Sequence, residues 1–289
     1  MDTQAGCLYT LVHADRSRHE EILDELVAPV TREVRDDPQL DSLFFARYNE
    51  PTWQVRYRVL GPEDWLREVV RPKVAARLEP LARRGSIQGH QFATYQRELP
   101  RYGGERGMRL AEKIFLHDTL ACLDLIAAER EGELAVSRRE FSMAFTERLL
   151  DLMRLHGERR LAFYQMGYRW AIDMKTWEET ELRLLEERYE HLQPALRDLF
   201  FGPREADSRR FWGGAAAARI AEGCLESMRP WIEQVLEGVQ AGWLAQDPVH
   251  LAWSFAHMQC NRLGIDPSPE AILRYLMHRL HQDGARARA

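Results

Sequence analysis

The stretch Thr52-Trp-Gln-Val-Arg-Tyr-Arg-Val-Leu60 decides how the first hundred residues fold. Its apolar and polar residues alternate, which is the period of a β-strand whose successive side chains lie on opposite faces of a sheet. The apolar face takes every second residue, namely Trp53, Val55, Tyr57 and Val59. The other face presents Arg56 and Arg58, whose side chains are about 7 Å apart in an extended strand.

Two arginines side by side on one face of a strand are suited to hold an anion. A guanidinium group matches carboxylates and phosphates in a two-pronged geometry, so Arg56 and Arg58 would orient a ligand as well as attract it. The alternative is a solvated sheet face on which carboxylates of a neighbouring element pair with both arginines.

The residues around this strand predict a ferredoxin-like βαββαβ order within residues 1–104. We expect strands at 7–13, 43–48, 52–60 and 87–97, and amphipathic helices at 17–35 and 62–84. Such an order gives one antiparallel sheet with both helices on one face. The other face would then be exposed and free to form a site.

The remainder, 105–289, has almost wholly helical spacing. We expect helices at 108–128, 138–156, 159–173, 177–198, 215–244, 248–262 and 269–281. The predicted fold class is therefore α+β, with a sheet-containing lobe packed on a mostly helical lobe as one intimate functional domain. An aromatic segment at 163–170 is expected to pack in the helical core, with the lining of a peptide channel as the alternative.

Composition narrows the class of protein. The 289 residues carry a net charge of −5, which argues against a general nucleic-acid binder. The four cysteines are widely spaced, so they are expected to be free thiols in a reducing compartment. No apolar stretch is long enough to span a membrane, and the N-terminus is unlike a signal peptide. These features predict a soluble, cytoplasmic protein.

A second basic segment, Tyr95-Gln-Arg-Glu-Leu-Pro-Arg-Tyr-Gly-Gly104, follows the last predicted strand. Its glycine pair permits a close backbone approach at the start of the next helix. We expect Arg97 and Arg101 to join Arg56 and Arg58 in one basic pocket floor. The alternative is a structural turn closed by an ion pair to Glu98.

His257 is the candidate acid/base residue. It shares a helix face with Asn261, and a histidine can give or take a proton near neutral pH. The alternative is a histidine satisfied within the core. The sequence contains no HExxH, GxSxG, Walker A or GxGxxG pattern. This argues against a hydrolase, a nucleotide-binding protein and a metal-dependent enzyme. No cofactor or metal is therefore expected.

Five runs of residues together resemble one family. They are Phe44-Phe-Ala-Arg-Tyr48, Val55-Arg-Tyr-Arg58, Tyr95-Gln-Arg-Glu98 with Arg101-Tyr-Gly-Gly104, Phe115-Leu-His-Asp-Thr119, and His257-Met-Gln-Cys-Asn-Arg-Leu-Gly264. In this order they resemble the C-terminal domain of class I lanthipeptide (lantibiotic) dehydratases, which also occurs as stand-alone thiopeptide biosynthesis proteins. The resemblance extends from about residue 7 to residue 280.

The resemblance implies a lyase that eliminates glutamate from glutamylated Ser or Thr of a ribosomal precursor peptide, leader plus core, to give dehydroalanine or dehydrobutyrine. Arg56 and Arg58 would grip the glutamyl group together with either Arg97 or Arg101, and His257 would be the acid/base. A separate glutamyl-tRNA-dependent protein would add the glutamate, because the expected glutamylation domain is absent from this sequence.

One departure from the family pattern bears on the reaction. The family commonly has histidine before the paired arginines, whereas this chain has Gln54. The alternative activity is that of a thiopeptide pyridine synthase, which joins two dehydroalanines by a formal aza-[4+2] cycloaddition and releases the leader peptide. A further, non-enzymatic alternative is a scaffold that binds a leader peptide along a free sheet edge.

Overall fold

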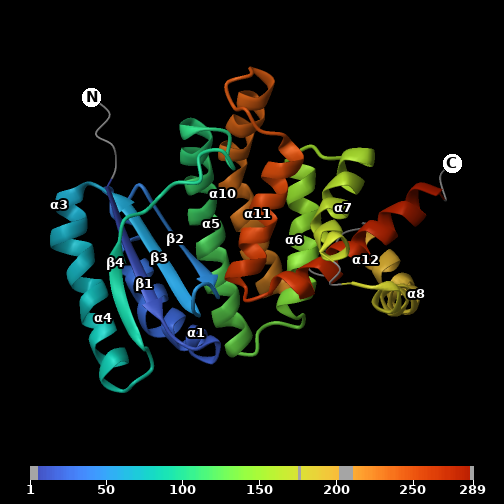
Figure 1. The fold of residues 1–289 in the computed structure, drawn as a ribbon. Coiled ribbons are helices and arrows are strands. Elements are labelled where there is room, and N and C mark those ends of the chain that lie inside the picture. The colour runs from blue at the N-terminus through green and yellow to red at the C-terminus, as the bar shows by residue number, and fades with distance from the viewer. Residues whose placement is uncertain (1–5, 175–176, 202–210, 287–289) are drawn as a thin grey trace.

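A four-stranded antiparallel sheet forms the N-terminal part of the computed structural model, which describes residues 6–174, 177–201 and 211–286 (Figure 1). The strands are β1 (Gly6–His13), β2 (Ser42–Tyr48), β3 (Gln54–Gly61) and β4 (Gly89–Ala93). They lie in the order β2-β3-β1-β4, with every neighbouring pair antiparallel. With the intervening helices this is the ferredoxin-like arrangement, so the predicted α+β fold class is confirmed.

Two helices of mixed type cover one face of the sheet (Figure 1). The first follows the short η1 (Arg16–Arg18) and consists of α1 (His19–Ile22), η2 (Leu23–Val27) and α2 (Ala28–Val34). The second consists of α3 (Glu63–Trp65), η3 (Leu66–Val70) and α4 (Arg71–Arg83). Val55, Tyr57 and Val59 are fully buried against them, as the alternation in β3 predicts.

The rest of the described chain is helical. Its helices are α5 (Glu105–Arg130), α6 (Arg138–Leu152), α7 (Gly157–Asp173), α8 (Glu179–Phe201), α10 (Ala215–Gln240), α11 (Pro248–Arg262) and α12 (Pro267–Arg286). α5 packs on β2 and has α10 along its other side, while α11 contacts β2, α5, α6 and α7. A boundary between two lobes at residue 104 stays a prediction. Within the described residues, no helix is both long and apolar enough to cross a membrane.

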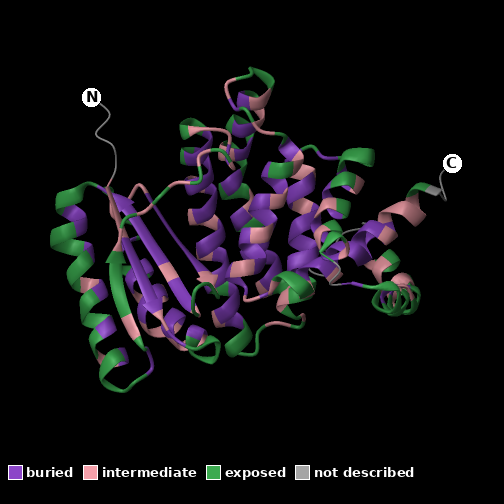
Figure 2. Cartoon of the chain, viewed as in Figure 1, coloured by how far each residue is buried: buried purple, intermediate pink, exposed green. Residues whose placement is uncertain are grey.

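The second face of the sheet is covered, which corrects the expectation that it would be exposed and free. Phe44, Ala46 and Leu60 on this face are buried in the same hydrophobic cluster as Phe115 of α5 (Figure 2). The alternation in β3 alone predicts a polar face, but β2 contributes apolar side chains to it. The face therefore packs on the helical part of the chain and leaves room for a site only around its arginines.

The fourth strand is shorter than the predicted 87–97. β4 ends at Ala93, which is paired with Tyr9 of β1. The residues that follow leave the sheet although β1 continues to Gly6, because Tyr95 turns over the second face, where its ring packs on those of Tyr9 and Phe44. In the helical part, the aromatic segment packs in the core as expected, since Phe163, Tyr164 and Tyr168 are buried.

Candidate functional site

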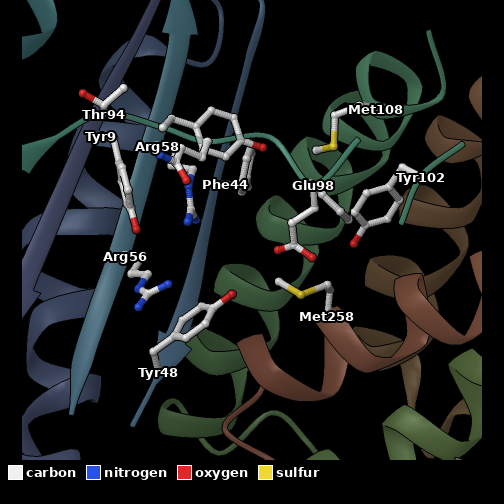
Figure 3. A pocket seen from close by; sticks show the side chains of 13 residues that line it. Tyr9, Phe44, Tyr48, Arg56, Arg58, Thr94, Glu98, Tyr102, Met108 and Met258 are labelled. Carbon is white, nitrogen blue, oxygen red and sulfur yellow. The ribbon is translucent and has the colours of Figure 1, made fainter. Parts of the chain in front are cut away.

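A cavity of about 280 Å³ lies between the second face of the sheet and the helices, and we call it the arginine cavity (Figure 3). Its residues come from β1, β2, β3, the segment between β4 and α5, and the helices α5 and α11: Tyr9, Phe44, Tyr48, Arg56, Arg58, Thr94, Tyr95, Gln96, Glu98, Tyr102, Met108, Phe115 and Met258. Arg56 and Arg58 point into it from β3, as the period of that strand predicts.

Aromatic rings surround Arg58. Tyr9 of β1 and Phe44 of β2 stand directly opposite it in the sheet, so both side chains lie on its face. The guanidinium carbon of Arg58 lies 4.3 Å from the ring centroid of Tyr9, 5.3 Å from that of Phe44 and 5.0 Å from that of Tyr95. These cation–π contacts hold the guanidinium in place without neutralising its charge.

Arg56 is held in the same way, but by one ring instead of three. Its guanidinium carbon lies 3.5 Å from the ring centroid of Tyr48, and its Nη2 donates to the carbonyl oxygen of Glu50 at 3.3 Å. The ion pairs between described residues include neither Arg56 nor Arg58, and the buried Nε atoms of both lack hydrogen-bond partners. The pair therefore presents two uncompensated positive charges to the cavity, unlike a solvated face neutralised by neighbouring carboxylates.

One carboxylate lines the far wall of the arginine cavity. Glu98 lies across from Arg56 and Arg58, close to Tyr102 and Met258 (Figure 3). Its side chain is about half exposed and accepts a hydrogen bond from Arg101 at 3.0 Å. The cavity thus has positive charge on its sheet side and a carboxylate on its helical side.

A second cavity, of about 390 Å³, adjoins the first and contains His257 and Arg101, and we call it the histidine cavity. Tyr48 and Met258 line both cavities and form the wall between them. The arginine pair and the histidine, 200 residues apart in the sequence, are therefore brought to the two sides of one wall.

The orientation of His257 is determined by two neighbours. Its ring stacks on that of Trp253, with centroids 5.1 Å apart and an angle of 2° between the planes. Its Nδ1 lies 2.7 Å from Oε2 of Glu270, which is buried. Burial acts to raise the pKa of Glu270, but the hydrogen bond from His257 and the charge of Arg274 outweigh it and lower that pKa. Glu270 is therefore a carboxylate.

Arg101 and Arg97 have different surroundings. Arg101 lines the histidine cavity, donates from Nε to Ser254 Oγ at 3.1 Å and lies over the ring of Trp253. Arg97 lines neither cavity and instead makes a two-pronged ion pair with Glu112, at 2.7 and 3.2 Å. The expected single floor of four arginines is thus divided: two lie in the arginine cavity, one in the histidine cavity, and Arg97 lies outside both.

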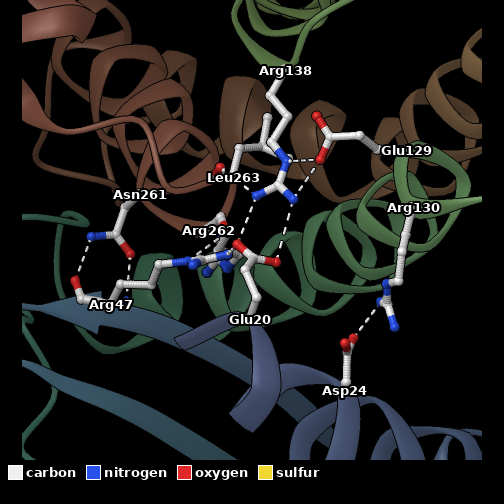
Figure 4. A network of polar contacts seen from close by, with 9 residues as sticks. All are labelled: Glu20, Asp24, Arg47, Glu129, Arg130, Arg138, Asn261, Arg262 and Leu263. Atoms are coloured by element: carbon white, nitrogen blue, oxygen red, sulfur yellow. Dashed lines mark hydrogen bonds and ion pairs between the residues drawn. The ribbon is translucent and has the colours of Figure 1, made fainter. Parts of the chain in front are cut away.

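Asn261 and Arg262, which follow His257 in the sequence, join α11 to the edge strand β2 (Figure 4). Asn261 accepts from the backbone N–H of Arg47 at 2.8 Å and donates to its carbonyl oxygen at 2.6 Å. Arg262, fully buried, donates to the carbonyl oxygen of Phe45 at 2.9 Å and to the carboxylate of Asp118. We call Asn261 and Arg262 the β2 latch, because they satisfy the outer edge of that strand.

A cluster of ion pairs borders the histidine cavity (Figure 4). Glu20 accepts from Arg138 at 2.8 Å and pairs with Arg47 at 2.9 Å. Burial acts to raise the pKa of Glu20, but these arginines, Arg138 first, lower it on balance. The charges of this cluster are therefore largely compensated within the protein.

Several site residues were not predicted from the sequence. The rings around Arg58 could have been found from strand register, because Tyr9 and Phe44 lie on predicted strands. Trp253 lies four residues before His257, which is a helical neighbour spacing. Glu270 carries no sequence signal, because its contact with His257 depends on how α12 packs on α11.

Comparison with solved structures shows the same fold. The tRNA-dependent lantibiotic dehydratase MibB from Microbispora sp. 107891 aligns with a TM-score of 0.72 and 21% identity, over 100% of this chain and 29% of MibB. The pyridine synthase TbtD from thiomuracin biosynthesis aligns with a TM-score of 0.67 and 15% identity, over 96% of this chain and 98% of TbtD. TsrL aligns with a TM-score of 0.67 and 18% identity, over 98% and 96% of the two chains.

Sequence comparison identifies the family. The subtilin biosynthesis protein SpaB of Bacillus subtilis is 25% identical over 158 residues, which are 55% of this chain and 15% of SpaB. The chain therefore corresponds to a minor part of the length of SpaB, as it does for MibB. A family model described as lantibiotic biosynthesis dehydratase C-term matches residues 8–281. The resemblance predicted from the five runs is confirmed, and the chain belongs to the family of lantibiotic biosynthesis dehydratase C-terminal domains.

Proposed function

We propose that this chain is a lyase that eliminates glutamate from glutamylated Ser or Thr residues of a ribosomally made precursor peptide. Membership of the lantibiotic dehydratase C-terminal family supports a role in the biosynthesis of modified peptides. The observation that carries the elimination reaction is the pair Arg56 and Arg58. Both line one small cavity, and neither has a carboxylate partner among the described residues.

The arginine cavity suits the leaving group. When the ester C–O bond breaks, glutamate departs with a new carboxylate in addition to the one it already carries. Arg56 and Arg58 would hold these two carboxylates through charge-assisted hydrogen bonds and stabilise the new one as its charge develops. Glu98 on the opposite wall would accept the ammonium group, which the glutamyl unit carries on its Cα atom. The two walls thus match the negative and the positive groups of one amino acid.

His257 in the histidine cavity would accept the proton that the elimination removes. Nδ1 of His257 faces the carboxylate of Glu270, so Nε2 carries the free lone pair of the neutral ring. In the proposed step Nε2 takes the α-proton of the esterified residue, and the C–H electrons form the Cα=Cβ double bond. The Cβ–O bond breaks and glutamate leaves with that electron pair, which gives dehydroalanine from Ser and dehydrobutyrine from Thr.

The proposal implies two partners. The substrate is a precursor peptide, leader plus core, and a separate glutamyl-tRNA-dependent protein would attach the glutamate. Incubation of the purified protein with a chemically defined glutamylated peptide tests the reaction directly. Mass spectrometry should show loss of one glutamate per modified residue and a peptide lighter than its unmodified form by the mass of one water per modified residue. An unchanged glutamylated peptide would contradict the proposal.

Arg58 variants test the anion site. Arg58→Ala is expected to lower the rate of glutamate loss by roughly 10²–10³-fold, because one preorganised donor to the developing carboxylate is removed. Arg58→Lys should give an intermediate rate, since it keeps the charge but loses the two-pronged geometry. The matched control is Arg67→Ala, an exposed arginine of the same half of the chain whose side chain is 60% exposed. Equal rates in Arg58→Ala and the control would contradict the assignment.

Arg97 and Arg101 should differ in what their loss changes. We expect Arg101→Ala to lower the elimination rate by about 10²-fold with little change in stability, because Arg101 lines the cavity of His257. Arg97→Ala should instead destabilise the fold by roughly 1–3 kcal/mol, because Glu112 would remain buried without its partner. Rates measured beside urea unfolding curves separate the two effects, and the opposite pattern would assign the third arginine to position 97.

The second candidate is the pyridine synthase reaction. This chain and TbtD correspond over almost their whole lengths, a likeness that concerns the fold. Gln54 does not favour that reaction over elimination, since it is buried and its amide donates to the carbonyl oxygen of Glu50 at 2.7 Å. The unpaired arginines favour elimination, because two dehydroalanines carry no carboxylate for them to bind. Release of the leader peptide from a polydehydrated substrate would select the synthase instead.

A further inference from the structure

The ring of His257 is the exposed end of a buried polar chain that continues into the helical core. Nδ1 of His257 meets Oε2 of Glu270 at 2.7 Å, and Oε1 of the same carboxylate accepts from Arg274 at 3.3 Å. Arg274 in turn donates to Thr146 at 2.8 Å. The side chains of Glu270 and Arg274 are only 5% and 2% exposed, so the chain is shielded from water.

The fold makes specific room for this chain. Gly167 of α7 has no side chain where Arg274 passes, and a Cβ there would come within 2.6 Å of the Cγ atom of Arg274. Glu270 lies in the first turn of α12, where the helix dipole favours a negative charge. A buried ion pair of this kind is costly to desolvate, and the cost is offset only where the geometry is good and further hydrogen bonds satisfy the remaining donors and acceptors.

We propose that Glu270 is a positioning residue for His257, with Arg274 fixing the carboxylate. The inference rests on the proposed role of His257 as the proton acceptor. An ionised Glu270 can only accept, so it holds the proton of the neutral ring on Nδ1 and leaves the lone pair on Nε2 facing the cavity. It also stabilises the imidazolium that forms when Nε2 takes the α-proton. Trp253 fixes the ring plane from the other side.

The other charged groups around His257 do not replace this carboxylate. In the histidine cavity Arg16 is paired with Asp266 at 2.5 Å, and Glu20 with Arg47 and Arg138. Arg101 lies over the ring of Trp253, on which His257 stacks, and is paired with Glu98. Burial and the charge of Arg47 lower the pKa of His19 to about 4, so it is neutral at pH 7. Among the described residues, Glu270 is the carboxylate that contacts the imidazole.

Glu270→Gln tests the inference in the elimination assay. We expect the rate to fall by roughly 10²–10⁴-fold, because the amide no longer enforces one tautomer and no longer stabilises the imidazolium. Glu270→Asp should recover part of the rate. The matched control is Glu233→Gln, an exposed glutamate of α10, which should leave the rate unchanged.

A second measurement needs neither activity nor a variant at Glu270. Nitrogen-15 NMR of the wild-type protein with labelled histidine, assigned with His257→Gln, should show the neutral ring protonated on Nδ1. A ring protonated on Nε2, or a Glu270→Gln enzyme with the wild-type rate, would overturn the inference. If the wild-type protein does not release glutamate but has the Nδ1 tautomer, the proposed reaction fails while the positioning role stands.

Discussion

The variant His257→Gln is expected to lower the rate of glutamate elimination by roughly 10²–10⁴-fold, the usual contribution of a positioned acid/base residue. Glutamine retains the size and polarity of the side chain but cannot take a proton. Binding of the glutamylated peptide should change little, because the anion is held by the arginine cavity on the other side of the wall formed by Tyr48 and Met258. The rate of glutamate release is measured under single-turnover conditions, and the affinity for the glutamylated peptide is measured separately.

A control on the same helix separates this effect from general damage to α11. His250 is exposed in the first turn of α11, two turns before His257. His250→Gln should therefore keep the wild-type rate. A His257→Gln protein that releases glutamate at more than a tenth of the wild-type rate would exclude His257 as the proton acceptor and leave only a structural role for it.

Removal of one partner of the buried pair Asp118–Arg262 is expected to have the largest effect on stability. Asp118→Ala should lower the free energy of unfolding by about 3–5 kcal/mol, because it leaves a fully buried guanidinium without its carboxylate. Burial raises the pKa of Asp118 even though Arg262 opposes the shift, which indicates how costly this charge is to bury. Urea unfolding followed by circular dichroism measures the change.

The double variant Asp118→Leu with Arg262→Met provides the decisive comparison. Two apolar side chains of similar size leave no unpaired charge, so the double variant should lose less stability than Asp118→Ala. The exposed pair Arg109–Glu105 on the same helix offers the control, since Arg109→Ala should change the free energy of unfolding by no more than about 0.5 kcal/mol. A double variant that loses as much stability as Asp118→Ala would contradict this expectation and assign the loss to the bond from Arg262 to the carbonyl oxygen of Phe45.

The fold was largely predictable because its signals are local. The alternation around Val55 and Val59, and the apolar periodicity of the two helices that follow β1 and β3, depend only on residues a few positions apart. The errors come from partners that the sequence of one element does not reveal. β4 stops at Ala93 because Tyr95 turns over the second face onto Tyr9 and Phe44, and the face of Arg58 is covered because β2 supplies Phe44 to it.

The candidate site was predictable to a smaller extent. The residue types of Arg56, Arg58 and His257 indicate their chemistry, but the sequence does not show that Tyr48 and Met258 divide the site into two cavities. Arg97 and Arg101 lie in the same segment between the last strand and the next helix, and their residue type gives neither one priority. Only the packing of α5 and α11 pairs one with Glu112 and brings the other to the cavity of His257.

The β2 latch has a consequence for the range of substrates. His257 and Asn261 lie on one face of α11, and Asn261 is bonded to the backbone of the strand that neighbours the arginine strand β3. The spacing between His257 and the arginine pair is therefore set by helix and sheet, independently of any loop. In the proposed reaction this frame would act on the ester and the α-proton, which every esterified residue presents, so one fixed geometry would serve successive positions of a peptide whose sequence differs at each.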